Sequence, residues 1–396
     1  MKRIILHVHI LNPKTFVSLT MQCIQIKITL VTTLLMSLFV SCKDTKESPS
    51  TSDKNSENLT TQVKVLKDKP HDTPVPQGMV WIAGGHFTQG ARQGDSFALD
   101  HEKPAHPVAV DGFFMDITEV TNDQFSEFVK QTGYITIAER EVDWEELKKQ
   151  LPEGTPKPHD SILQPGSLVF KKTETSVPNL YDFSQWWVWK IGANWKHPKG
   201  PGSSIEGKGN YPVVHIAFPD AVAYCNWAGR KLPTEAQWEL AASAGINNKP
   251  FTWGDKLDQL DVKANTWTGE FPTQNDQVDG FENKAPVKSF PPNPYGLYDM
   301  AGNVWEWTSD WYHIDYYKQL LHEGLAHNPE GAQKAFNPTN PYAQEKIIKG
   351  GSFLCSDTYC ASYRISARMA TAIDSGQEHL GFRTIVTPEM LEGTVN

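Results

Sequence analysis

The residues best suited to chemistry lie in one stretch, 349–383, which opens on two glycines and closes on Gly-Phe-Arg. It contains Cys355 and Cys360, two of the five cysteines in the 396-residue chain. Aromatic and basic side chains surround this pair: Tyr359, Tyr363, Arg364 and Arg368. Two thiols separated by four residues could form a disulfide, bind a metal ion or act as a reactive dithiol.

Each of these interpretations makes a different demand on the rest of the chain. Nearby cysteines of an exported protein are usually bridged, so a structural disulfide is the simplest interpretation. Zinc needs four ligands, but with Cys23 and Cys42 assigned to a targeting segment only Cys225 remains, and no second C-x-x-C or H-x-x-x-H pattern is present. Two thiolates would suit a soft ion such as Cu(I). The spacing disfavours zinc but leaves the disulfide and the reactive pair open.

Composition limits the class of protein. Hydrophobic residues make up 39% and charged residues 21%, which is ordinary for a globular domain with a sizeable core. The net charge of −9 and the absence of any Lys/Arg-rich run exclude nucleic acid as an expected partner. Thirteen tryptophans, with many glycines and prolines, predict a loop-rich α+β fold held together by buried aromatic side chains.

Residues 1–42 are expected to be a lipoprotein signal peptide, with Met21 as the true start. The apolar run 28–40 is too short to span a bilayer, and Lys27 supplies positive charge before it. Residues 38–42 resemble a lipobox, so Cys42 would carry the lipid that anchors the exported protein at the bacterial envelope. The alternative is a plain signal peptide with an incidental cysteine. Residues 43–77 are polar enough to form a disordered tether, and 78–390 would form a single folded domain.

Local patterns predict the elements of that domain. Thr121 with Gln124, and Thr234 with Gln237, are capping boxes that start helices, which should end at Gly133 and Gly245. The other expected elements are strands at 79–82, 108–115 and 346–349, helices at 139–151 and 219–228, and an irregular surface excursion at 311–345. Cys225, His197 and His215 are expected to be structural.

The cysteine stretch resembles the C-terminal core of the formylglycine-generating enzymes, the sulfatase-modifying oxidases. The match is G-G-S, two residues, Cys, three residues, Tyr-Cys, then Tyr-Arg, Ala-Arg and Gly-Phe-Arg. Strings at 192–198, 232–239 and 302–307 match as well, whereas 372–376 departs from the family's Thr-Pro-Asp-Ser-Ser. The resemblance covers roughly 78–388. It implies the irregular, loop-rich α+β sulfatase-modifying-factor fold, which is related to C-type lectins.

The resemblance also implies a set of site residues. Cys355 and Cys360 would hold one Cu(I), Ser352 and Tyr359 would line the oxygen side, and Arg364, Arg368 and His379 would shape the peptide groove or the second shell around the metal. From spacing alone, the polar loops at 265–281 and 299–306 are ordinary turns, but the family places calcium there. The ligands of the first calcium would be Asn265, Thr266, Asp279 and Phe281, and those of the second Asp299, Gly302, Val304 and Glu306.

The implied function is that of a copper-dependent oxidase. It would use molecular oxygen to convert a cysteine in a C-x-P-x-R-type motif of an exported sulfatase to formylglycine. The alternative is a non-catalytic envelope lipoprotein of the same fold, which would not need the cysteine pair. An iron-dependent sulfoxide synthase would need a three-histidine site that the sequence lacks, and a lectin-like sugar binder rests on fold analogy alone.

Overall fold

The computed structural model describes residues 63–246 and 248–392. The predicted signal peptide, Cys42 and the first part of the tether lie outside the described residues. Residues 63–69 contact the first strands, where the Leu66 amide donates to Asp111 Oδ1 and the Trp81 indole donates to the Lys67 carbonyl. The ordered chain therefore begins before residue 78. None of the described helices has the length and apolar character needed to cross a bilayer.

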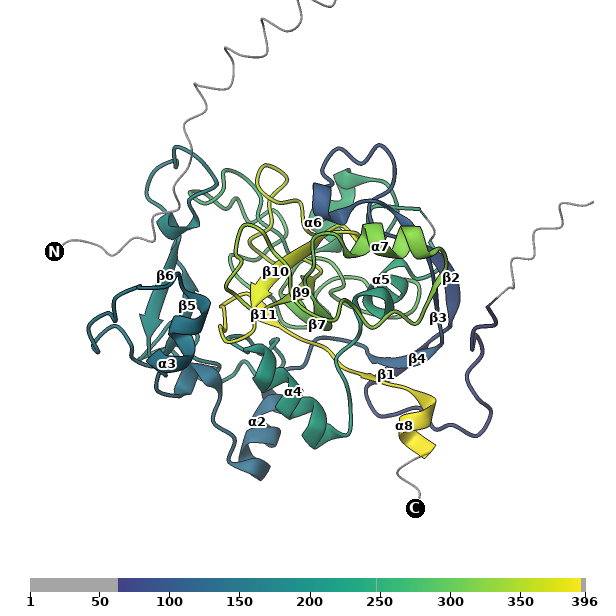
Figure 1. The fold of residues 1–396 in the computed structure, drawn as a ribbon, viewed down its shortest axis with the longest axis horizontal. Coiled ribbons are helices and arrows are strands. Elements are labelled where there is room, and N and C mark those ends of the chain that lie inside the picture. Colours follow the sequence, from purple (N-terminus) through teal and green to yellow (C-terminus); the bar gives the residue numbers. More distant parts are fainter. Residues whose placement is uncertain (1–62, 247, 393–396) are drawn as a thin grey trace, which may run out of the picture. The chain divides into compact units, whose positions relative to one another are not determined.

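Short strands and helices alternate with long loops, as predicted (Figure 1). The strands are β1 (Met79–Ile82), β2 (Gly85–Gln89), β3 (His106–Val110), β4 (Phe113–Asp116), β5 (Gly166–Phe170), β6 (Trp187–Ile191), β7 (Trp305–Trp311), β8 (Ala326–His327), β9 (Glu345–Lys349), β10 (Arg368–Ala372), β11 (Leu380–Gly381) and β12 (Ile385–Val386). The helices are α2 (Asn122–Thr132), α3 (Trp144–Leu147), α4 (Phe218–Ala228), α5 (Glu235–Ser243), α6 (Leu260–Lys263), α7 (Tyr316–Glu323) and α8 (Pro388–Glu392).

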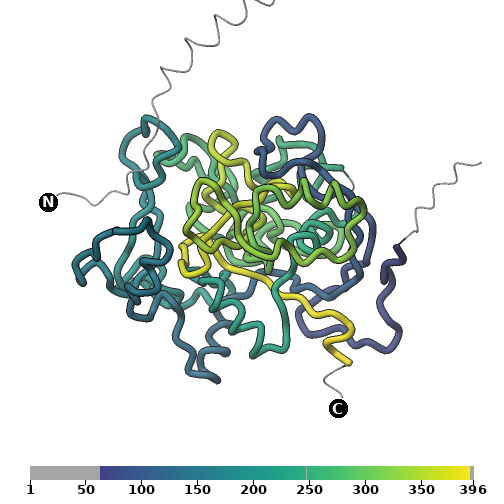
Figure 2. The backbone as a smooth tube through the Cα atoms, viewed as in Figure 1, coloured from purple at the N-terminus to yellow at the C-terminus, as the bar shows by residue number. Residues whose placement is uncertain are grey.

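The largest sheet has four strands in the order β10-β9-β7-β11. Strand β9 pairs antiparallel with β7 and with β10, and the loop that joins β9 to β10 carries both cysteines of the predicted site. Three smaller sheets surround it, in the orders β1-β4-β12, β2-β3-β8 and β5-β6. The C-terminal strand β12 pairs with β4, so the end of the domain returns to its first strands (Figure 2).

Large aromatic side chains fill the core, as the tryptophan content predicted. Trp186, Trp238, Trp305 and Trp307 are among the largest fully buried side chains. Trp305 and Trp307 lie two residues apart on β7. Because side chains on a strand alternate between its two faces, both tryptophans lie on the same, buried face. The α+β, loop-rich class is thereby confirmed.

Both predicted capping boxes are present. The Gln124 amide donates to Thr121 Oγ1 at 3.4 Å while the Thr121 amide donates to Gln124 Oε1 at 2.8 Å. The Thr234–Gln237 pair repeats this exchange at the start of α5. Helix α2 ends at Gly133 as predicted, but α5 ends one residue early, because Ala244 already takes the left-handed conformation.

Three predicted elements were wrong in detail. Segment 108–115 is two strands, because the chain turns at Asp111–Gly112, where a side chain at Gly112 would collide with the Trp81 ring. Segment 139–151 breaks into α3 and two single turns of 3-10 helix. The excursion 311–345 contains α7. Tyr317 of this helix is fully buried, and its ring is tilted against the ring of His106.

His215 is buried, and its ring nitrogens contact Ser167 Oγ and the Pro198 carbonyl oxygen. Burial lowers the pKa of His215 from 6.5 to about 3, so the unfolded chain binds the proton more tightly than the folded one. We expect the free energy of unfolding to fall as pH drops below 6.5, by up to about 1.4 kcal/mol per pH unit. Urea unfolding at about pH 7 and about pH 4.5 measures this difference. His215→Gln should reduce it, and an unchanged difference would contradict the assignment.

Candidate active site and calcium loops

Tight turns in the β9–β10 loop bring the two predicted thiols together. The Cys355 amide donates to the Ser352 carbonyl at 2.9 Å, and the Cys360 amide donates to the Ser356 carbonyl at 3.0 Å. Both cysteines are free, with Cys355 buried and Cys360 half-buried. Their side chains are in hydrogen-bond contact with each other. The pair is therefore a dithiol in this structure, and not the disulfide that remained open from the spacing.

The two thiols have different acidities. Burial raises the pKa of Cys355 well above its usual range, and its contact with Cys360 raises it further. Burial also raises the pKa of Cys360, but hydrogen bonds from Cys355, Ser362 and Ser356 outweigh it, so that the pKa is lowered overall. Cys360 is therefore the more acidic of the two thiols. Two facing sulfurs of this kind suit a soft monovalent metal ion.

Ser352 and His379 lie beside the pair. Ser352 Oγ is 3.1 Å from His379 Nδ1, and His379 Nε2 is 2.8 Å from Gln377 Oε1. Burial lowers the pKa of His379 to about 3, so the ring is neutral. Donation from Nε2 to Gln377 leaves Nδ1 as an acceptor for the Ser352 hydroxyl. This chain of contacts fixes the direction of the Ser352 hydroxyl next to Cys355.

An aromatic wall covers the other side of the cysteine segment. The Tyr359 ring stacks on Phe271 with centroids 4.5 Å apart and meets Trp186 edge-on at 5.8 Å. Trp187 lies against His379 at 4.7 Å. Phe271 was missed by sequence reasoning, because nothing in its local pattern distinguishes it from an ordinary core residue. Phe271 belongs to one apolar cluster of buried residues, together with Phe170, Trp186, Trp267, Phe353 and Leu354.

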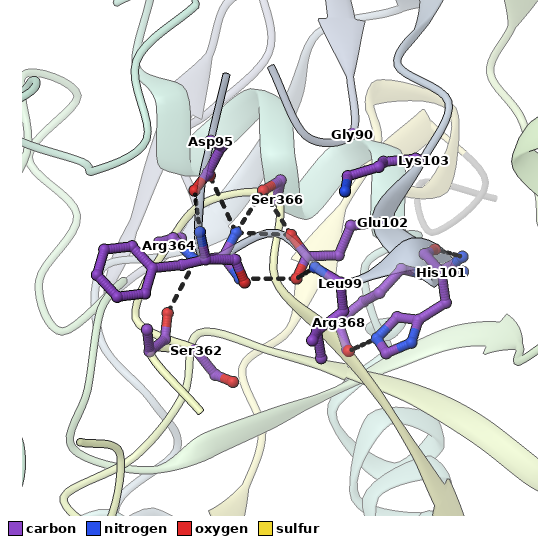
Figure 3. Close-up of polar contacts among 12 residues, drawn as sticks. Gly90, Asp95, Leu99, His101, Glu102, Lys103, Ser362, Arg364, Ser366 and Arg368 are labelled. Carbon is purple, nitrogen blue, oxygen red and sulfur yellow. Dashed lines mark hydrogen bonds and ion pairs between the residues drawn. The ribbon is translucent and has the colours of Figure 1, made fainter. Parts of the chain in front are cut away.

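Arg364 and Arg368 are buried in ion pairs. Arg364 makes a bidentate pair with Glu102 at 2.6 and 2.7 Å and also reaches Asp95 at 3.1 Å (Figure 3). Arg368 donates to Glu235 Oε2 at 2.8 Å. Both guanidinium groups are thus occupied by buried carboxylates, Glu102 and Asp95 for Arg364 and Glu235 for Arg368. These two arginines would therefore affect the predicted peptide groove indirectly, by fixing the conformation of the chain around the cysteines.

The first predicted calcium set is assembled around Asp279. The Thr266 amide donates to Asp279 Oδ2 at 2.8 Å, and the Phe281 amide donates to Asp279 Oδ1 at 3.0 Å. Asn265 is buried, and its Oδ1 accepts no hydrogen bond from any described residue. A buried carbonyl oxygen without a donor is costly, and a cation would satisfy it. The residues present therefore fit a hard ion such as Ca²⁺.

The second set fits in part. Asp299 Oδ1 is buried and accepts no hydrogen bond within the described chain, and it faces an equally unpaired oxygen, Oε2 of Glu119. Burial raises the pKa of Asp299 to about 6, and burial and Asp299 together raise that of Glu119. Glu306, in contrast, is held by Arg383 at 2.7 Å and by the Trp238 indole at 2.8 Å.

The two loops that are predicted to bind calcium are joined to each other. The Asn303 amide donates to the Asn265 carbonyl at 2.9 Å, and Asn303 Oδ1 accepts from Asn265 Nδ2. Gly302 must be glycine, because its φ is 75° and a side chain would collide with the Asn265 carbonyl. Glu119 was missed by sequence reasoning, although it lies in the family's Glu-Val-Thr-Asn turn. No cluster of three His, Cys, Asp or Glu side chains suited to a metal occurs in residues 63–246 and 248–392, so both sets would depend on carbonyl and amide oxygens.

Comparison with known proteins places the whole domain. The family profile described as "Sulfatase-modifying factor enzyme 1-like domain" matches residues 64–388. The chain belongs to this family. The match begins at residue 64, in agreement with the contacts of residues 63–69. The structure of PvdO from Pseudomonas aeruginosa is similar in fold, with a TM-score of 0.53 and 21% identity over 78% of this chain and 94% of that one.

Curated members of the sulfatase-modifying factor family are considerably closer in sequence. The "Formylglycine-generating enzyme" of Mus musculus is 42% identical over 307 residues, covering 77% of this chain and 74% of that protein. The protein of the same name from Thermomonospora curvata is 40% identical over 325 residues, covering 81% and 98%. The "Inactive C-alpha-formylglycine-generating enzyme 2" of Mus musculus is 35% identical over 308 residues, covering 77% and 84%.

Proposed function

We propose that this protein is a formylglycine-generating enzyme for sulfatase maturation. It would use molecular oxygen and copper to oxidise the cysteine of a C-x-P-x-R-type motif in an exported sulfatase. The observation that carries the proposal is the meeting of Cys355 and Cys360 as free thiols whose side chains contact each other. Relatives named as formylglycine-generating enzymes at about 40% identity support the reaction class.

The reaction sets an electron balance. Converting a CH₂–SH side chain to an aldehyde removes two electrons from carbon and releases sulfur as H₂S. Full reduction of O₂ to water consumes four electrons, so a thiol reductant would supply the other two. Bound Cu(I) would provide the soft centre that joins a thiol substrate to oxygen.

The chain's own residues would prepare this site. Cys355 and Cys360 would hold the ion through their sulfurs, and the Ser352 oxygen, whose hydrogen is donated to His379, would lie beside Cys355 as an acceptor. The stacked rings of Tyr359 and Phe271 would exclude water from the reacting atoms. Each role uses a group that the fold already holds in one position.

Copper loading gives the first test of this proposal. Reduced protein titrated with Cu(I) against a competing chelator should bind one ion per chain. Cys355→Ser and Cys360→Ser should each abolish this binding, while Cys225→Ala, which removes a buried thiol outside the pair, should retain it. Absence of a tight Cu(I) site in the wild type would leave the non-catalytic lipoprotein as the better explanation. We keep the non-catalytic alternative because one relative in the family is named as inactive.

Calcium would stabilise the fold at the two loops. A ligand that binds only the native state raises its stability by mass action, so excess chelator should lower the Tm. Asp279→Ala and Asp299→Ala should each remove part of the calcium response, since each deletes an anchor of one set. Glu306→Ala should destabilise the protein with or without chelator, because it leaves Arg383 unpaired in the core. An identical melting curve in chelator and in calcium would contradict both sites.

The proposed location follows from the proposed substrate. An enzyme that matures exported sulfatases would act on the same side of the membrane as its substrate, and a lipid on Cys42 would keep it at the envelope. Mass spectrometry of the mature N-terminus tests this. A lipid-modified Cys42 is expected, and an unmodified chain that starts before Cys42 would contradict the anchor.

A further inference from the structure

A small cavity lies beside Glu378, the residue that precedes His379. Its volume is about 130 Å³, well below the roughly 300 Å³ and more that drug-sized ligands occupy. Three lysines line it: Lys199, Lys208 and Lys284. The cavity therefore concentrates positive charge in a space large enough only for a small ligand.

One carboxylate faces these lysines, and it is already paired. Glu378 is fully buried, its Oε2 accepts from the Phe170 amide at 3.0 Å, and its Oε1 lies 2.5 Å from Lys199 Nζ. The charge of Lys199 is thus matched. Lys208 and Lys284 are left as two positive charges that the cavity walls do not compensate.

Lys284 is the more confined of the two. It is half-buried, and its ammonium group makes no hydrogen bond or ion pair with any residue that the structure describes. Burial is the main reason that its pKa is lowered to about 8, and Lys199 and Lys208 contribute to the decrease while Glu378 opposes it. An ammonium in such a position is costly unless an anion accompanies it.

Neutral donors complete the cavity. Ser204 Oγ accepts from the Glu206 amide at 2.9 Å, which leaves the hydroxyl hydrogen free to donate. Tyr211 also lines the cavity, and its hydroxyl has no acceptor in the described part of the chain. Lysines and hydroxyl donors that outnumber the one carboxylate of the cavity, Glu378, form a pattern that favours an oxyanion.

We propose that this cavity binds a small oxyanion, such as sulfate or phosphate, between Lys208 and Lys284. A carboxylate from a polypeptide has the same chemistry and would use the same donors. The site is separate from the cysteine pair and needs no copper.

Calorimetry at low ionic strength tests the proposal, with sodium sulfate, sodium phosphate and N-acetyl-aspartate as probes. Wild-type protein should bind sulfate or phosphate saturably, and Lys284→Gln and Lys208→Gln should each weaken binding by about tenfold or more. Lys334→Gln, an exposed lysine outside the cavity, is the matched control and should bind as the wild type does. Displacement of sulfate by N-acetyl-aspartate would identify a carboxylate as an additional source of the anion.

A second measurement separates binding from folding. Without added anion, Lys284→Gln should melt at the wild-type temperature or above it, because an uncompensated charge has been removed. With sulfate, the wild type should gain stability and the variant should not. Wild-type protein without a saturable heat for any probe, or a Lys284→Gln variant that binds as tightly, would overturn the proposal. Cu(I) loading serves as an independent control, because it should be the same in both proteins.

Discussion

Replacing Cys360 with serine should abolish oxidation of a C-x-P-x-R peptide while the protein stays folded. Serine is nearly the same size as cysteine, but its hydroxyl is a poor ligand for Cu(I) and is not ionised near neutral pH. Cys355→Ser should have the same effect, because one thiolate cannot replace a pair. Turnover in copper-loaded protein, measured with a thiol reductant and oxygen, provides the test.

The matched control is Cys225, a free buried cysteine of the same core cluster that is not a member of the pair. Cys225→Ala should retain turnover, and its modest effect should be on stability. Urea unfolding of all three variants separates loss of chemistry from loss of fold. Near-normal peptide oxidation by Cys355→Ser or Cys360→Ser would remove the basis for a dithiolate site.

The second large effect concerns Arg364. Arg364→Ala should destabilise the protein by about 3–5 kcal/mol, because it leaves Glu102 charged and unpaired in the interior. The double variant Glu102→Gln/Arg364→Met should recover part of that loss, since Glu102 is then no longer a buried charge without its partner, although Asp95 still loses its contact with Arg364. Free energies of unfolding for Glu102→Gln, Arg364→Met and the double variant measure the coupling.

Arg140 is exposed and serves as the comparison. Arg140→Ala should change stability by no more than about 1 kcal/mol. If Arg364→Ala unfolds at the wild-type denaturant concentration but raises the KM for the peptide, the arginine binds substrate directly. The buried ion pair would then not be its main role.

Local sequence rules predicted the elements that depend on local contacts. The capping boxes at Thr121 and Thr234 were predicted correctly, because the exchange of hydrogen bonds involves residues only three apart. The split of 108–115 could not be predicted in this way. It depends on Trp81 of β1 lying against Gly112 in the turn between β3 and β4.

The same distinction applies to the candidate site: contacts between residues close in the chain could be predicted, and contacts between distant residues could not. The spacing of Cys355 and Cys360 predicted that they could meet, whereas the contact of Ser352 with His379 depends on the pairing of β11 with β7. Burial of Arg364 was not predictable, because its partner Glu102 lies 262 residues away in the chain. Because this distant partner is not visible in the sequence, Arg364 was predicted to shape the peptide groove.

We infer that this chain oxidises a cysteine by means of the Cys355–Cys360 pair. Incubation of the reduced protein with a C-x-P-x-R peptide, Cu(I), oxygen and a thiol reductant, followed by mass spectrometry of the peptide, tests this inference. We expect a product that has lost sulfur and gained an aldehyde oxygen, formed only when copper, oxygen and both thiols are present. An unchanged peptide with the fully copper-loaded wild-type protein, or an aldehyde formed equally well by Cys360→Ser, would contradict it.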